Sequence, residues 1–229
     1  MPSNLPEILF QMIAFLFAIS VHESAHAWTA SRCGDPTARM LGRVSLNPIR
    51  HIDPIGTVLL PLVAAISHIP MLGWAKPTPV DPRNFRHPVR DDILTSVAGP
   101  VSNFIVATGA VVLLWIVSFT SETGHALVRL VASGVEPSSG TFLDPVVRLM
   151  YDMMFINVVL AVFNLIPVPP LDGSHVIRHF LSEPIRRICD NIGIFGLLAL
   201  VYLGGGLLSA LIRPFRDFYN SLLVNVLNG

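Results

Sequence analysis

Long apolar runs, separated by short polar loops, dominate the chain. Four of them are close to the length of about 20 residues that an α-helix needs to cross a bilayer: residues 8–30, 93–119, 146–166 and 192–212. A fifth run, residues 54–69, is shorter and carries Pro61 in its middle. The pattern predicts an all-α integral membrane protein, a bundle of about four to six transmembrane helices.

Composition supports a membrane protein, since 52% of the 229 residues are hydrophobic and 13% are charged. Soluble domains have about a quarter charged residues. The formal net charge is zero, and no basic face points to nucleic acid. Cys33 and Cys189 are the only cysteines, which excludes a disulfide framework and a cysteine-based metal motif.

Loop charges predict how the chain crosses the membrane. The loops at residues 31–54 and after residue 69 are both basic, so the positive-inside rule puts both on the cytoplasmic side. Residues 54–69 must then dip in and return, or lie along the interface. We interpret them as a re-entrant element beside an active site, because irregular backbone at that depth needs cover from protein or a water-filled cavity. Short β-strands near that site are a further option.

The later loops extend this topology. The loop between residues 119 and 146 is mainly acidic and fits the outer side, so the following apolar run returns inward and delivers Asp172 to the cytoplasmic side. Arg213 and Arg216 follow residues 192–212, which fits poorly with an outer C-terminus and leaves open whether that run spans. Gly204-Gly205-Gly206 within it allows either close helix packing or a bend.

The first apolar run contains a metal-binding pattern, His22-Glu23-Ser24-Ala25-His26. Two histidines four residues apart lie on one helix face, where both can bind one Zn²⁺, and the adjacent glutamate can serve as a general base. Zinc lowers the pKa of a bound water towards about 7. Ionisable side chains within a membrane helix also favour a functional site.

A catalytic zinc needs a third protein ligand, and Asp172 is our candidate. It follows a run in which Pro167, Pro169 and Pro170 break the preceding helix, and Gly173 permits a tight turn. The predicted topology puts Asp172 on the same side as the zinc motif. The alternative is that Asp172 caps a helix at the membrane surface.

Together, three motifs resemble the site-2 protease family of intramembrane zinc metalloproteases, in its compact prokaryotic branch. They are the zinc motif, Ala98-Gly99-Pro100-x-x-Asn103, and the run Asn164-x-x-Pro-x-Pro-x-x-Asp172-Gly173. The resemblance implies that His22, His26 and Asp172 bind one zinc ion and that Glu23 is the catalytic base. It also implies that Asn164 and Asn103 lie near the substrate. Asn103 fits a hydrogen bond between helices equally well, whereas the position of Asn164 beside the proline break favours a functional role.

Other candidate residues have simpler interpretations. His175 and His179 are one turn apart, but a solvated pair fits them better than a metal site. His51 and Asp53 precede the re-entrant stretch, where an Asx-type turn explains the aspartate.

We therefore expect residues 1–229 to form a single membrane-embedded peptidase domain without PDZ or CBS domains, in a prokaryotic cell membrane, with its active site open to the cytoplasm. It would cut transmembrane segments of other proteins. The alternatives are a metal-ion transporter, which leaves Glu23 without a task, and a non-catalytic zinc-binding membrane protein. The oligomeric state and the identity of the substrate are not predicted.

Overall fold

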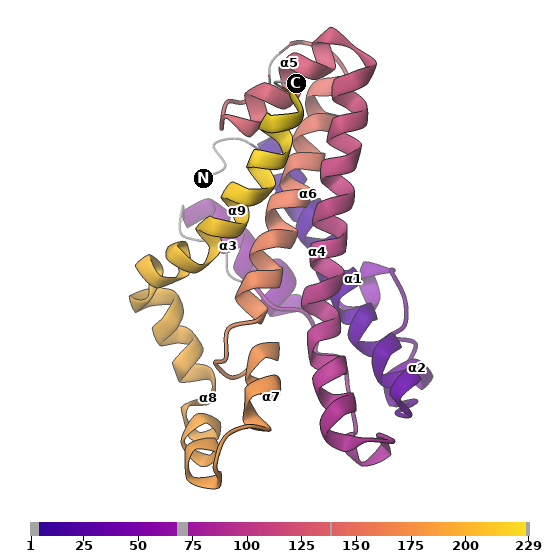
Figure 1. Ribbon diagram of the computed structural model, residues 1–229, viewed down its shortest axis with the longest axis vertical. Helices are drawn as coiled ribbons and strands as arrows, with labels where there is room; N and C mark the ends of the chain where they lie inside the picture. The colour runs from indigo at the N-terminus through magenta and orange to yellow at the C-terminus, as the bar shows by residue number, and fades with distance from the viewer. Residues whose placement is uncertain (1–4, 68–72, 138, 228–229) are drawn as a thin grey trace.

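Three long helices form the body of the protein (Figure 1). The computed structural model describes residues 5–67, 73–137 and 139–227. Within them, α1 (Leu5–Cys33), α4 (Pro88–Thr120) and α6 (Leu143–Asn164) pack against one another. All three are long and apolar enough to cross a membrane, as predicted. Each helix starts a few residues earlier than its apolar run, and each has one acidic residue in its first turn: Glu7, Asp91 or Asp144.

The fourth predicted span is broken. Where one helix was expected over residues 192–212, α8 (Glu183–Leu203) ends at Gly204 and α9 (Gly205–Leu227) follows at a bend of 79°. Of the two roles that the sequence allowed the glycines, a bend is the one adopted. The described residues thus provide three spanning helices, which is below the expected four to six, or four if the bent pair counts as one span, which is the low end of that range.

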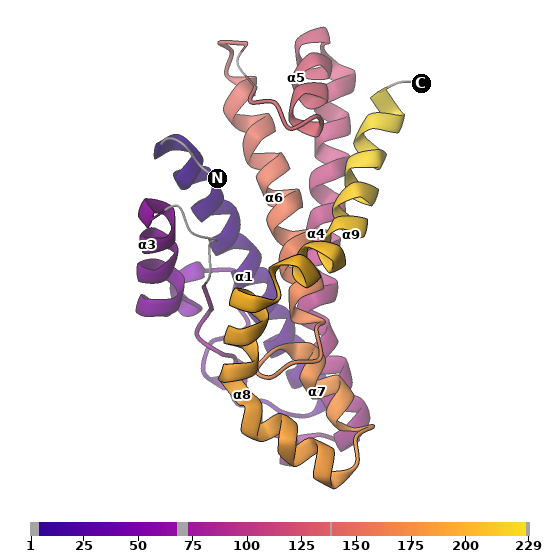
Figure 2. The same cartoon turned by 90° about the vertical axis from the view of Figure 1, so that its left-hand side faces the viewer.

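Residues 54–67 form two short helical pieces (Figure 2). A π-helix, η2 (Pro54–Leu59), leads into α3 (Leu60–Ser67), and the predicted end at residue 69 lies outside the described residues. Asp53 Oδ1 accepts hydrogen bonds from the amides of Ile55 and Gly56 at 3.0 and 2.7 Å, so the predicted Asx-type turn is confirmed. No β-strand occurs in the described part of the chain, and the re-entrant path stays a prediction.

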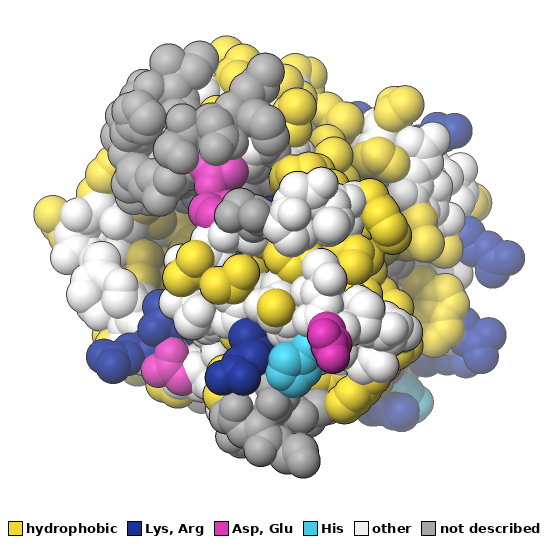
Figure 3. All heavy atoms as spheres, turned by 90° about the horizontal axis from the view of Figure 1, so that it is seen from above, with side chains coloured by type: hydrophobic (Ala, Val, Ile, Leu, Met, Phe, Trp, Pro, Cys, Tyr) yellow, Lys and Arg dark blue, Asp and Glu magenta, His cyan; other side chains and the backbone are white. Residues whose placement is uncertain are grey.

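The apolar core lies towards one end of the bundle, where α5 (Glu122–Ala132) covers α4, α6 and α9. Leu114, Leu127, Val147, Met154 and Leu223 are fully or almost fully buried there. The surface of this end carries acidic and basic side chains among apolar ones (Figure 3). The buried apolar side chains of α4, α5, α6 and α9 therefore stabilise this end of the bundle.

A buried ion network also ties α1 to α6. Arg148 contacts Asp152 at 3.0 Å and Glu7 at 3.5 Å, and it also pairs with Glu136. Its guanidinium offers five donors in a fixed fork, so it can serve several carboxylates at once.

The remaining helices lie towards the opposite end from α5 (Figure 1). α7 (Asp172–Arg178) packs on α4, and α2 (Thr37–Met40) follows α1. Two single 3-10 turns complete the fold, η1 (Pro48–Arg50) and η3 (Pro82–Asn84). The end of α1 and the start of α7 thus share one end of the molecule, as the loop charges predicted.

Candidate metal centre and active site

His22 and His26 form the centre of the site, on consecutive turns of α1. Their Nε2 atoms are 3.0 Å apart, and both side chains are buried. Each ring is fixed through its other nitrogen. His22 Nδ1 bonds to Asn103 Oδ1 at 3.0 Å, and His26 Nδ1 bonds to the Thr95 carbonyl at 2.7 Å. Because a carbonyl oxygen only accepts hydrogen bonds, each Nδ1 carries the proton and each Nε2 presents a lone pair.

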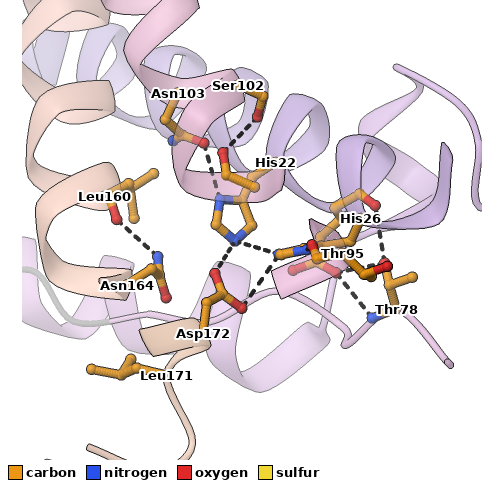
Figure 4. Close-up of polar contacts among 12 residues, drawn as sticks. His22, His26, Thr78, Thr95, Ser102, Asn103, Leu160, Asn164, Leu171 and Asp172 are labelled. Atoms are coloured by element: carbon orange, nitrogen blue, oxygen red, sulfur yellow. Dashed lines mark hydrogen bonds and ion pairs between the residues drawn. The ribbon is translucent and has the colours of Figure 1, made fainter. Parts of the chain in front are cut away.

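Asp172 completes the cluster from the first turn of α7 (Figure 4). Its Oδ2 lies 3.2 Å from His22 Nε2 and its Oδ1 lies 3.4 Å from His26 Nε2. The cap of α7 is Leu171, so Asp172 is not the capping residue that the alternative interpretation required.

Gly173 explains how Asp172 reaches the histidines. A Cβ at this position would lie 2.2 Å from the Leu165 carbonyl oxygen and 2.7 Å from that of Ile166. Only glycine therefore lets α7 turn so tightly against the end of α6. The sequence already indicated a tight turn here. The structure shows that the turn brings Gly173 close to the carbonyls of Leu165 and Ile166.

Zinc fits the three ligands. Bonds of 2.0 to 2.2 Å in a tetrahedron separate neighbouring ligand atoms by about 3.4 Å, and the observed separations are 3.0 to 3.4 Å. Asp172 Oδ2 is buried without a hydrogen-bond donor, as expected of an atom whose contact is a cation. Among the described residues, this is the one group whose ligand atoms converge within 4.8 Å.

Gly99 on α4 faces both histidines. A Cβ there would lie 2.4 Å from His26 Nε2 and 2.7 Å from His22 Nε2. The absent side chain leaves space directly against the ligand atoms. Sequence reasoning placed Gly99 in a family motif without giving it a role, and only the packing of α4 on α1 reveals one.

Glu23 lies next to the ligands in the chain and is held by Thr78. The Thr78 amide donates to Glu23 Oε2 at 2.9 Å, and the Thr78 hydroxyl reaches the same oxygen at 2.7 Å. Sequence reasoning missed Thr78. The signal available was a threonine between Pro77 and Pro79, which fixes an extended backbone but does not name its contact.

The two asparagines have different surroundings. Asn103 is fully buried and contacts His22, so in the structure it orients one ring of the candidate metal centre. Asn164 lies near the end of α6, on the Asp172 side of the cluster (Figure 4), and its Nδ2 donates to the Leu160 carbonyl at 2.9 Å. Contact of either residue with a substrate stays a prediction.

The weaker candidates lie outside this cluster. His179 pairs with Asp92 at 2.7 Å, and His175 is exposed, so the two do not join in a metal site among the described residues. His51 is buried and contacts the Ser45 carbonyl through Nε2 at 2.7 Å, in line with a structural role.

Comparison with known proteins agrees with this site. The model of peptidase family M50 matches residues 10–203. Several relatives carry the name "Putative zinc metalloprotease". One is YwhC of Bacillus subtilis (strain 168), 36% identical over 85% of this chain and 79% of its own length. Another is Rip2 of Mycolicibacterium smegmatis (strain ATCC 700084 / mc(2)155), 29% identical over 82% of this chain and 64% of its own length. No solved structure is significantly similar.

A regulator of sigma E protease from Salmonella typhi is 32% identical, over 58% of this chain and 30% of its own length. The family match covers Glu23 and all three candidate zinc ligands. The chain therefore belongs to peptidase family M50, and it is a zinc-dependent protease.

Proposed function

We propose that this protease hydrolyses peptide bonds in or near transmembrane segments of other membrane proteins, with Glu23 as its general base. The observation that carries the proposal is the position of the ligands: His22 and His26 lie within the span at Glu7–Cys33. A site built into a spanning helix meets substrates that are themselves in the membrane. Polar side chains at that depth are costly unless they serve a function.

The protein's own residues divide the work. His22, His26 and Asp172 hold zinc, which, when bound, acidifies a water and polarises the substrate carbonyl. Glu23 takes a proton from the attacking water as its oxygen bonds to the carbonyl carbon. The same carboxyl then gives that proton to the departing amide nitrogen as the C–N bond breaks.

A helical substrate must unwind before it can react, because its carbonyls are engaged in hydrogen bonds within the helix. Helix-destabilising residues near the cut should therefore favour cleavage. The basic loops share the end of the molecule at which α7 starts, which supports an active site open to the cytoplasm.

Replacing Glu23 with glutamine tests the proposal. The amide keeps the shape but cannot take a proton, so cleavage of a membrane-embedded reporter should fall about 10²- to 10⁴-fold while one zinc per chain is retained. Glu122→Gln is the control, since this exposed residue lies on α5 at the far end. Comparing membrane proteomes of cells with wild-type and E23Q enzyme should reveal a transmembrane fragment that accumulates only in the mutant.

The outcomes separate the alternatives. Wild-type cleavage by the Glu23→Gln variant would refute the base mechanism. A wild-type protein that binds zinc, cuts no membrane reporter and moves zinc across vesicles would be a transporter. Zinc binding with neither activity would identify a non-catalytic binding protein.

A further inference from the structure

Thr78 is the residue closest to the proposed chemistry that still lacks a role. It lies on an extended segment, residues 74–81, that passes the end of the zinc motif. Its amide and hydroxyl converge on one oxygen of Glu23, and the hydroxyl also lies 3.1 Å from the Glu23 carbonyl. In the described part of the structure, no hydrogen bond reaches the other carboxylate oxygen, Oε1.

The segment is anchored on both sides of Thr78. Upstream, the buried Arg43 donates to the carbonyls of Lys76 and Pro77 at 2.7 and 2.6 Å. Downstream, the fully buried Asp35 accepts the Asp81 amide at 2.8 Å. Two buried charged side chains thus fix residues 76–81 in place, and Thr78 lies between them.

Local sequence also presets Thr78. Pro77 and Pro79 have no amide hydrogen, so Thr78 supplies the only N–H between Lys76 and Val80. A residue before proline is confined to extended conformations. The single amide of this stretch therefore has a fixed direction, and it points at Glu23.

We infer that Thr78 is a positioning residue for Glu23, a role that rests on the proposed function. Two donors on Oε2 fix the rotation of the carboxylate and leave Oε1 to face the water. Without them, a carboxylate one residue from a zinc ligand can rotate and compete as a further ligand. Thr78 thus prevents Glu23 from binding the metal and orients its carboxylate towards the attacking water.

The test uses the full-length protein in detergent and three variants. Thr78→Val keeps the shape and the amide but removes the hydroxyl, and Thr78→Ser keeps the hydroxyl. Thr57→Val is the matched control, because the buried Thr57 hydroxyl donates at 2.7 Å to the Trp74 carbonyl on the same segment but does not contact Glu23. Each protein is assayed for kcat and KM on a membrane reporter, zinc per chain and thermal stability.

We expect Thr78→Val to lower kcat about 10-fold, the effect of losing one hydrogen bond to a charged group, with KM and zinc unchanged. Thr78→Ser should recover most of kcat, and Thr57→Val should keep it. A wild-type kcat in Thr78→Val, or an equal loss in Thr57→Val, would overturn the inference. So would a loss of kcat that follows loss of zinc. Wild-type protein that cuts no membrane reporter would instead refute the proposed function.

Discussion

Adding one methyl group at Gly99 should damage the metal centre although none of the proposed ligand residues is replaced. In Gly99→Ala, the new Cβ would lie 2.4 Å from His26 Nε2 and 2.6 Å from His22 Cε1. These rings are the proposed zinc ligands, and each is held at its other nitrogen by Asn103 or Thr95. The rings therefore have no free direction in which to yield.

The size of the effect follows from the distances. Ordinary contacts begin near 3.4 Å, so His26 Nε2 and the new methyl must separate by about 1 Å. Metal–ligand distances tolerate only about 0.2 Å, and a misplacement of 1 Å at an active site costs about 100-fold in rate. We expect zinc content well below one per chain and cleavage slower by about 100-fold.

The assay compares purified Gly99→Ala with Gly109→Ala. Gly109 is on the same helix and is exposed, and the methyl group that alanine would add there meets no described neighbour within 4 Å. Alanine there should stabilise α4 by about 0.5–1 kcal/mol and leave zinc and cleavage unchanged. Zinc is measured by elemental analysis and cleavage on a membrane reporter. Full zinc and full activity in Gly99→Ala would refute this account of the packing, and equal losses in both variants would point to α4 itself.

Two further predictions concern the surroundings of the site. Asn103→Leu should weaken zinc binding about 10- to 100-fold in chelator competition, because His22 loses its acceptor; unchanged affinity would show that Asn103 does not orient it. Burial raises the pKa of Asp35, but hydrogen bonds from Thr37 and the Asp81 amide outweigh it and lower that pKa below 3.8. A lowered pKa in the folded state stabilises the protein above the unfolded value, and this contribution is lost as pH falls through the lowered value. The protection factor of the Asp81 amide, which is its exchange rate relative to the intrinsic rate at the same pH, should therefore fall below about pH 4 in the wild type. In Asp35→Asn it should already be lower at pH 7, and a protection factor that neither change affects would contradict this account.

The main helices were predictable because length and hydropathy determine them locally. An apolar run long enough to span must satisfy its backbone internally, which leaves the helix as its structure. The length and hydropathy of the run at residues 192–212 do not predict the bend at Gly204. A triple glycine fits both close packing and a break, and contacts from distant helices select between them.

The zinc motif was predictable for a similar reason, since four residues on a helix bring His22 and His26 together whatever surrounds them. The sequence predicted on which side of the membrane Asp172 lies, but it could not predict the distance between Asp172 and the two histidines. Thr78 and Gly99 could not be found, because their contacts join segments far apart in the chain; Thr78 and Glu23 are 55 positions apart. Such pairs have no local pattern.

The three proposed zinc ligands are widely separated along the chain, which sets the order in which the site can be assembled. The first two ligands are on α1, and the third follows only at the start of α7. Chains emerge from the ribosome with the N-terminus first, so His22, Glu23 and His26 are in the membrane long before Asp172 is made. A nascent chain thus carries the base and an incomplete set of ligands while other membrane proteins are being inserted nearby. The proposed three-ligand site can therefore be complete only after Asp172 has been made.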